Sequence, residues 1–299
     1  MGSETITAAD AGTWKFGELS VNRLGLGAMR LTGSAAFDLG VPREREPSIA
    51  VVRRAVELGV NHIDTASFYF SSLRSANELI NRALDPYPDD LVIVSKVGPG
   101  RDPSGTWYWA TPDQLRGQVE ENLRQLGRDH LDVVNLRAKR PGTPIAELFG
   151  ALAELRDAGL VRHLGVSNVD QEQLAAARAI APVVCVQNPY SVDAGRAAGD
   201  DLLRFCGEQG IAFVPFYALA GEGRDIGRQG DEVGTVEDIA RAHGASVTQV
   251  RIAWTLQQGP HVLAIPGTGN PDHLAENVAA AGLRLTSEEM ARLDALGKV

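Results

Sequence analysis

The sequence predicts a (β/α)8 barrel, and three observations lead to that expectation. Eight short segments rich in Val, Ile and Leu alternate with segments of helical periodicity along the 299 residues. Several of the strand-like segments are apolar nearly throughout, as parallel strands buried on both faces are. The polar residues that interrupt this pattern gather at the carboxyl ends of the segments, the end at which barrels carry their sites.

The expected strands are 21–29, 61–66, 91–97, 131–137, 162–168, 183–188, 211–219 and 262–268. Residues 14–21 are expected to form a small hairpin that closes the lower end of the barrel. A doubly wound sheet is the alternative, and it should show a glycine fingerprint after its first strand. Gly25 and Gly27 are followed neither by a third glycine in register nor directly by a helix. We therefore favour the barrel.

The helices between the strands have readable ends. Thr111-Pro112 is a typical helix start, with Gln114 at the capping-box position, and Gly127 is the expected stop. Thr143-Pro144 and Gly159 are expected to bound the next helix. The remaining helices are expected over 47–58, 75–84, 171–180, 200–209, 235–257 as a broken pair, 271–281 and 286–296.

Composition excludes several classes of protein. A net charge of −9 disfavours binding to nucleic acid or to an anionic membrane. No apolar run is long enough to span a bilayer, and no secretory signal is apparent. The two cysteines stand in apolar surroundings, which favours a reducing, cytoplasmic location, and no cluster suggests a metal. We expect one domain over 1–299, with 1–12 disordered, as a monomer or a weak homo-oligomer.

Four residues near the carboxyl ends of the strands form a candidate catalytic set. A tyrosine hydroxyl ordinarily titrates near about 10 and is a poor acid at neutral pH, but a nearby cation favours its phenolate. Lys96 can supply that cation to Tyr69, and Asp64 can keep the lysine charged. Such a tyrosine suits protonation of a carbonyl oxygen while hydride arrives at carbon. Arg137, at the end of 131–137, adds a permanent cation.

Each of these residues alone is more often structural, and Asp64 with Lys96 alone could be an ion pair at the barrel rim. Their coincidence at matching strand ends favours function. A Schiff-base aldolase would use Lys96 as its nucleophile, and the paired Asp64 argues against that reading. A serine hydrolase is disfavoured because GVSNV (165–169) lacks the second glycine of a nucleophile elbow.

Several motifs occur in the order known from one enzyme family: HIDTASFY (62–69), IVSKVG (93–98), HLGVSN (163–168), VQNPY (186–190) and IPGTGNPDHLAENV (265–278). With them the chain resembles the aldo-keto reductases from about Trp14 onward. The resemblance implies a (β/α)8 barrel that reduces carbonyls with a nicotinamide cofactor. It also implies that Asp64, Tyr69 and Lys96 are three of four catalytic residues.

The fourth catalytic residue of that family is a histidine, and Arg137 stands in its place. In this respect LDVVNLR (131–137) more closely resembles a bacterial subgroup that includes pyridoxal reductases. Arginine only donates hydrogen bonds and stays charged, whereas histidine can relay a proton. We expect Arg137 to orient the substrate oxygen and stabilise its negative charge; the alternative is an ion pair with a carboxylate at the rim.

The resemblance also implies the cofactor site. Asn270 is a candidate N-cap before Pro271, and the helix that it starts favours an anion. Gly267 and His273 stand where many members carry Lys and Arg, which weakens the electrostatic case for NADP, yet the subgroup implies NADPH rather than NADH. The implied cofactor contacts are Ala28, Met29, Asp64, Ser167, Asn168, Gln187, Phe216, Tyr217, Ala218, Leu219, Gly221, Ile265, Gly267, Thr268, His273, Glu276 and Asn277.

The sequence indicates less about the substrate than about the catalytic residues and the cofactor. Phe70 replaces the glycine that usually follows the catalytic tyrosine, and Trp107, Tyr108 and Trp109 are expected to wall a pocket for a flat ring. The alternative is a hydrophobic plug in the loop. A pyridoxal-like aldehyde, a secondary-metabolite ketone and a sugar all remain open as the small-molecule substrate. A slow, NADP-binding regulatory protein on the same fold is the second functional reading.

Overall fold

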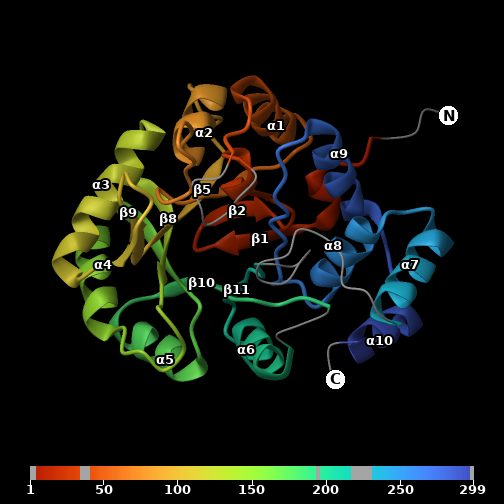
Figure 1. Ribbon diagram of the computed structural model, residues 1–299. Coiled ribbons are helices and arrows are strands. Elements are labelled where there is room, and N and C mark those ends of the chain that lie inside the picture. The colour runs from red at the N-terminus through yellow and green to blue at the C-terminus, as the bar shows by residue number, and fades with distance from the viewer. Residues whose placement is uncertain (1–4, 34–40, 193–195, 217–230, 297–299) are drawn as a thin grey trace.

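Seven parallel strands form the central sheet of the computed structural model, which describes residues 5–33, 41–192, 196–216 and 231–296. Their spatial order is β11-β10-β9-β8-β5-β4-β3, and every neighbouring pair is parallel. The sheet curls on itself (Figure 1). Its strands are β3 (Leu26–Gly27), β4 (His62–Asp64), β5 (Val92–Val97), β8 (Leu131–Arg137), β9 (Val161–Ser167), β10 (Val183–Gln187) and β11 (Ala212–Phe213).

The eighth predicted strand closes the barrel through isolated bridges. Val262 bridges Phe213 and Ala264 bridges Leu24, both in parallel. The backbone of Leu263 donates to the Phe213 carbonyl, and that of Ala264 donates to the Arg23 carbonyl, each at 2.9 Å. The predicted (β/α)8 barrel is thereby confirmed. The strands predicted over 21–29 and 262–268 are much shorter than expected, because the chain turns into a 3-10 helix after Gly27 and Pro266 has no N–H to donate. Of the strand predicted over 211–219, β11 covers Ala212–Phe213, and residues 217–219 lie outside the described part of the chain.

Helices surround the sheet as an outer ring (Figure 1). They are α1 (Arg45–Glu57), α2 (Ala76–Leu84), α3 (Leu115–Leu126), α4 (Ala146–Asp157), α5 (Gln171–Ile180), α6 (Arg196–Glu208), α7 (Asp231–His243), α8 (Val247–Gln257), α9 (Pro271–Ala279) and α10 (Ser287–Leu296). Short 3-10 helices add η1 (Ala8–Ala11), η2 (Ala28–Leu31), η3 (Pro112–Gln114) and η4 (Ala280–Gly282). Within the described part of the chain, none of the helices has the length and apolarity to cross a membrane.

Local signals explain most helix ends. Thr111 and Gln114 form the predicted capping box, and Gly127 takes the left-handed conformation, with φ 64°, that ends α3. The predicted break in 235–257 falls between α7 and α8, where Ser246 caps the second helix. The helix predicted to start at Thr143-Pro144 begins only at Ala146.

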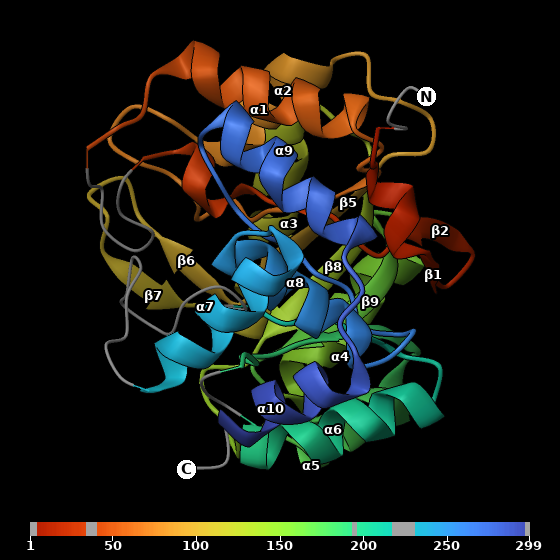
Figure 2. The ribbon, with the colours of Figure 1, turned by 90° about the vertical axis from the view of Figure 1, so that its right-hand side faces the viewer.

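Two antiparallel hairpins flank the barrel at opposite ends (Figure 2). The first, β1 (Thr13–Phe16) with β2 (Leu19–Asn22), is the predicted plug, because its Phe16 and Val21 pack among the inward-facing residues of the strands. The second, β6 (Pro99–Arg101) with β7 (Trp107–Trp109), lies beyond the strand predicted over 91–97, in a stretch for which no strand was predicted. It contributes to the end of the barrel that carries the candidate site.

The N-terminal residues differ from their prediction. Residues 8–11 form η1 rather than a disordered tail; Ala8 and Ala11 are buried, and the Ala8 N–H donates to the Leu58 carbonyl at 2.8 Å. The reciprocal capping of Thr7 and Asp10 explains why so short a helix forms here. Residues 1–4 lie outside the described part of the chain.

The barrel interior explains how the strands position the site. Successive side chains of a strand point to opposite faces, so the residue two positions beyond an inward-facing one also faces inward. Val94, Cys185 and Val214 belong to the apolar cluster inside the barrel. Two positions further along the same segments come Lys96, Gln187 and Phe216, which occupy the next layer toward the carboxyl ends.

Candidate active site

Asp64 and Lys96 form a buried ion pair at the carboxyl ends of β4 and β5. The ammonium Nζ of Lys96 donates to both carboxylate oxygens of Asp64, at 2.6 and 2.7 Å, and to the Thr65 carbonyl at 3.1 Å. Only 2% of the Lys96 side chain and 6% of the Asp64 side chain is exposed. The pair predicted from sequence is therefore formed, and it is shielded from solvent.

Tyr69 lies directly beside this pair. The Lys96 ammonium is 5.1 Å from the centroid of the Tyr69 ring, and the tyrosine is 8% exposed. Burial opposes the charge on Lys96, but the Asp64 carboxylate and the Tyr69 hydroxyl more than offset it, so the pKa of Lys96 lies above its usual range. The ammonium is therefore charged at neutral pH and sits next to a phenol.

Polar groups from β9 and β10 extend the set on the far side of Asp64. Gln187 Nε2 donates to Asp64 Oδ2 at 2.8 Å. Its other amide atom, Oε1, and the hydroxyl of Ser167 are buried and have no hydrogen-bond partner among the described residues. Asn168 follows with a positive φ of 58° and donates through Nδ2 to the Ala138 carbonyl at 3.1 Å. One acceptor and one hydroxyl are thus available to a ligand.

Arg137 ends β8 next to Ser167 of β9. Its guanidinium carbon lies 5.0 Å from the centroid of the Phe216 ring, in cation–π geometry. No ion pair between Arg137 and a carboxylate is found within the described ranges of the chain. The rim ion pair that was the alternative reading of Arg137 is therefore not what the described residues show.

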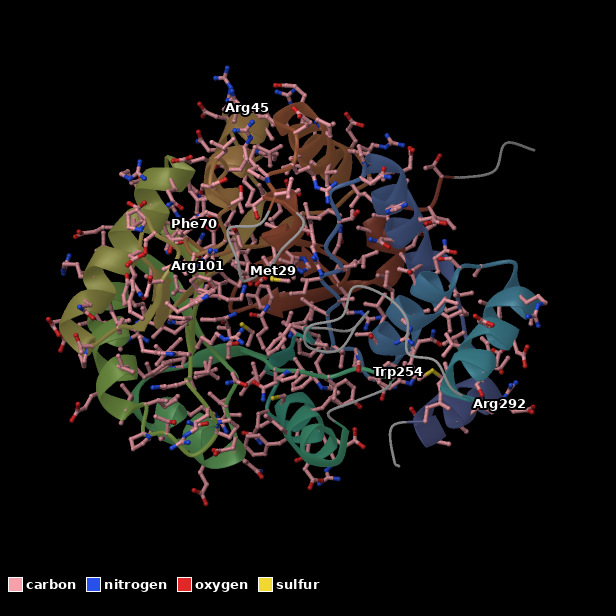
Figure 3. The ribbon with its side chains drawn as sticks, viewed as in Figure 1. Met29, Arg45, Phe70, Arg101, Trp254 and Arg292 are labelled. Atoms are coloured by element: carbon pink, nitrogen blue, oxygen red, sulfur yellow. The ribbon has the colours of Figure 1, made fainter. Side chains whose placement is uncertain are left out.

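The segments after β3 and before α9 approach each other closely. A side chain on Gly27 would meet the Ile265 carbonyl at 2.6 Å, and one on Gly267 would meet the Gly27 carbonyl at 2.9 Å. Ala28 is buried, and Met29 lies near the middle of the barrel in the view of Figure 3. This close backbone approach places both predicted segments at one edge of the barrel mouth.

The start of α9 is built as the sequence predicted. Asn270 caps it by accepting from the Asp272 N–H at 2.9 Å, with Pro271 in the first turn. The Thr268 hydroxyl accepts from the Asn270 N–H at 3.1 Å. Of the predicted contacts on the helix, His273 and Glu276 are exposed and Asn277 is buried. The predicted contacts Tyr217, Ala218, Leu219 and Gly221 lie outside the described residues.

The aromatic residues predicted to wall a substrate pocket do not form one wall. Trp107, Tyr108 and Trp109 are consecutive in β7 and 38–42% exposed, so strand alternation sends Tyr108 to the opposite face from the two tryptophans. Tyr108 lines a cavity of about 630 Å³ together with Phe70, whereas neither tryptophan does. The contact of these aromatic residues with a substrate stays a prediction.

Two arginines at this end were not identified from sequence. Arg101 of β6 is 8% exposed and stacks on the rings of Phe70 and Trp107. Arg43 lies against Gly269, at the turn before α9, and its buried Nε has no hydrogen-bond partner among the described residues. Both belong to segments without a motif. Only the absence of a side chain at Gly269, which leaves room for a neighbour, could have hinted at Arg43.

Comparison with known proteins places this arrangement in a family. The family model "Aldo/keto reductase family" matches residues 23–298. The chain is 44% identical to pyridoxine 4-dehydrogenase of Escherichia coli K12 over 294 residues, which cover 96% of this chain and 98% of the relative.

Solved structures agree with that comparison. A thermostable aldo-keto reductase, Tm1743, solved with the inhibitor epalrestat, shares the fold with a TM-score of 0.80 and 33% identity, covering 95% of this chain and 99% of the other. The aldo-keto reductase of Klebsiella pneumoniae in complex with NADPH gives a TM-score of 0.77 and 30% identity, covering 95% and 94%. This chain belongs to the aldo/keto reductase family of NAD(P)H-dependent oxidoreductases.

Proposed function

We propose that the protein reduces an aldehyde or a ketone to an alcohol with NADPH, and that Tyr69 donates the proton. The observation that carries the proposal is the buried chain from the Asp64 carboxylate through the Lys96 ammonium to the Tyr69 ring. When bound, the reduced nicotinamide supplies a hydride to the carbonyl carbon. The carbonyl π electrons then move to oxygen, which takes the proton of the Tyr69 hydroxyl.

In this proposal each member of the set has a separate task. Asp64 holds Lys96 in its charged form inside a site that would otherwise neutralise it. The Lys96 ammonium stabilises the phenolate that Tyr69 becomes once it has given up its proton. Arg137 adds a donor for the substrate oxygen while negative charge develops there.

The unpartnered polar atoms fit a carboxamide, which has both a donor and an acceptor. Gln187 Oε1 can accept from the amide NH₂, and the Ser167 hydroxyl can donate to the amide oxygen. The pairing of Gln187 Nε2 with Asp64 fixes which atom of that side chain faces the ligand. Ser167, Asn168 and Gln187 would therefore hold and orient the nicotinamide, and Phe216 would offer its ring face.

Arg43 supports a preference for NADPH over NADH. Its side chain packs on Gly269, beside the capped start of α9, where a 2′-phosphate would meet a cation and the positive end of the helix dipole. Arg43 then supplies the positive charge that Gly267 and His273 do not.

We predict that Arg43→Gln weakens NADPH binding about tenfold, which corresponds to the loss of one charge-assisted hydrogen bond, and leaves the affinity for NADH unchanged. Fluorescence titration with both nucleotides checks this, and an equal loss for both would contradict it.

For the substrate we propose a pyridoxal-like aldehyde. The support is the name of the E. coli relative, pyridoxine 4-dehydrogenase, which is 44% identical to this chain. The proposal also includes a reducing, cytoplasmic compartment, since Cys185 and Cys206 are buried free thiols.

The test is NADPH oxidation followed by absorbance against a panel of aldehydes and ketones that includes pyridoxal, repeated with NADH. We expect turnover with NADPH and the highest kcat/KM for pyridoxal. Turnover of other carbonyls but not pyridoxal would reject only the substrate class. Tight NADPH binding without turnover of any carbonyl would reject the enzymatic proposal in favour of a regulatory protein.

A further inference from the structure

Arg101 of hairpin β6–β7 forms hydrogen bonds to the loop that carries Tyr69. Arg101 Nη1 donates to the Phe70 carbonyl at 2.9 Å and to the Phe68 carbonyl at 3.4 Å, the residues on either side of Tyr69. Its guanidinium carbon also lies 4.4 Å from the ring centroid of Phe70 and 5.2 Å from that of Trp107. Figure 3 labels Arg101 and Phe70 on the same side of the barrel. One side chain therefore holds the backbone on both sides of Tyr69.

The side chains around Tyr69 belong to the same cluster. The Phe68 ring packs edge-on against both Tyr69, at 5.1 Å between centroids, and Trp107, at 5.7 Å. Within its strand pair Arg101 stands opposite Trp107. The arginine and the tryptophan of one hairpin thus enclose Phe68 and Phe70, and Tyr69 lies between these two along the chain.

The loop is only partly packed on this side. Phe68 is 4% exposed and belongs to the hydrophobic core, whereas Ser67 and Phe70 are partly exposed, and all three border the cavity of about 630 Å³. Other hydrogen bonds, such as Ser71 N–H to the Arg74 carbonyl and Ala76 N–H to the Tyr69 carbonyl, tie the loop to itself and to the start of α2. They fix the shape of the loop but do not connect it to β6.

From these contacts we propose that Arg101 is a positioning residue that fixes the Tyr69 hydroxyl relative to the carbonyl substrate. The inference rests on the proposed role of Tyr69 as proton donor. In this proposal Arg101 acts through the backbone carbonyls of Phe68 and Phe70. A rigid fork with several N–H donors suits this task better than an ammonium, because it can bond carbonyls in its plane while its faces stack on aromatic rings.

The inference predicts a specific defect in Arg101→Ala. A displacement of the proton donor by about 1 Å is expected to lower kcat about 10–100-fold. The Kd for NADPH should stay at the wild-type value, and KM for the carbonyl should change less than kcat. Because proton transfer would become the slower event, the solvent deuterium isotope effect on kcat should rise. Arg101→Lys, which keeps the charge and loses the fork, should be intermediate.

Arg116→Ala is the matched control, since Arg116 is 56% exposed on α3 and pairs only with the exposed Glu120 among the described residues. Wild-type kcat in Arg101→Ala would overturn the inference. So would a loss of activity that parallels a loss of NADPH binding and of Tm, because the role would then be structural. Tyr69→Phe separates the two proposals: if it retains kcat, the proposed function fails whatever Arg101 does, and if it loses kcat while Arg101→Ala does not, only this inference fails.

Discussion

His62 and Lys96 are both buried inside the barrel, but the pKa of His62 is lowered and that of Lys96 is raised. His62 stands at the start of β4, where its ring meets Phe16 of the plug edge-on at 6.1 Å, and burial lowers its pKa to about 4. Lys96 stands at the other end of β5, where burial also opposes its charge but Asp64 and Tyr69 raise its pKa. The histidine is neutral at pH 7, and the lysine is charged.

The difference between the two residues shows what allows a buried position of the barrel to carry the charge that an active site needs. Burial alone disfavours any charge, and a carboxylate in direct contact reverses that effect. At the plugged end the layer is built of apolar residues such as Phe16, Val21 and Val92, which contribute to stability. At the carboxyl end the next layer carries an ion pair that is costly to bury and chemically useful.

The largest expected effect comes from removing the carboxylate that distinguishes the two ends. Asp64→Asn leaves Lys96 buried without its anion, and breaking a buried pair in this way typically costs about 3–5 kcal/mol of unfolding free energy. We expect that loss in urea denaturation at pH 7, together with loss of carbonyl reduction. Asp113→Asn, which alters an exposed carboxylate of η3 that accepts from the Thr111 hydroxyl, is the control. Wild-type stability in Asp64→Asn would show that Lys96 does not depend on its partner.

Arg137 also lies at the carboxyl end of the strands. Replacing it tests whether a positive charge at this end contributes to carbonyl reduction. If the arginine stabilises the developing oxyanion, Arg137→Ala should lower kcat by about 100–1,000-fold, as the loss of one such donor does. Arg137→His should recover part of that loss, because imidazole can also donate. Steady-state kinetics with the best carbonyl of the panel measures both. If both variants keep wild-type kcat/KM, Arg137 has no catalytic role.

At the plugged end the comparison predicts an acid instability. As pH falls below about 6.5 the unfolded chain protonates His62, whereas the native state resists until about pH 4, so native stability falls over this window. The native pKa near 4 corresponds to a loss of about 3 kcal/mol, complete below that pH. In His62→Leu the unfolding free energy should therefore fall less between pH 7 and 4.

His273→Leu, which removes an exposed histidine, should keep the steep wild-type dependence. Equal slopes in the wild type and His62→Leu would contradict the neutral, buried state assigned to His62.

Sequence was sufficient where local signals act alone. The strand predicted over 131–137 is β8 to the residue, because a run of Leu and Val buried on both faces has no competing structure. The capping box of Thr111 and the left-handed Gly127 were readable for the same reason. The pairing of Asp64 with Lys96 followed from the barrel rule that strand ends converge.

Sequence was insufficient where contacts join distant segments. Hairpin β6–β7 has turn-forming residues at Asp102-Pro103-Ser104-Gly105 but no alternating polarity in its strands, and the stacking of its Arg101 on Phe70 and Trp107 joins segments far apart in the sequence. Arg43 approaches Gly269 only because the barrel closes between β3 and the segment before α9. The short bridges at Val262 and Ala264 likewise depend on neighbours that the eighth segment meets only in the closed barrel.

The central claim is that the charged layer makes Tyr69 a proton donor. Its most direct measurement compares wild type and Tyr69→Phe for carbonyl reduction and for NADPH binding in the same preparations. We predict that the variant binds NADPH with the wild-type Kd and that its kcat is lower by about 100–10,000-fold, the usual contribution of a positioned general acid. A Tyr69→Phe variant that turns over at the wild-type rate would contradict the account.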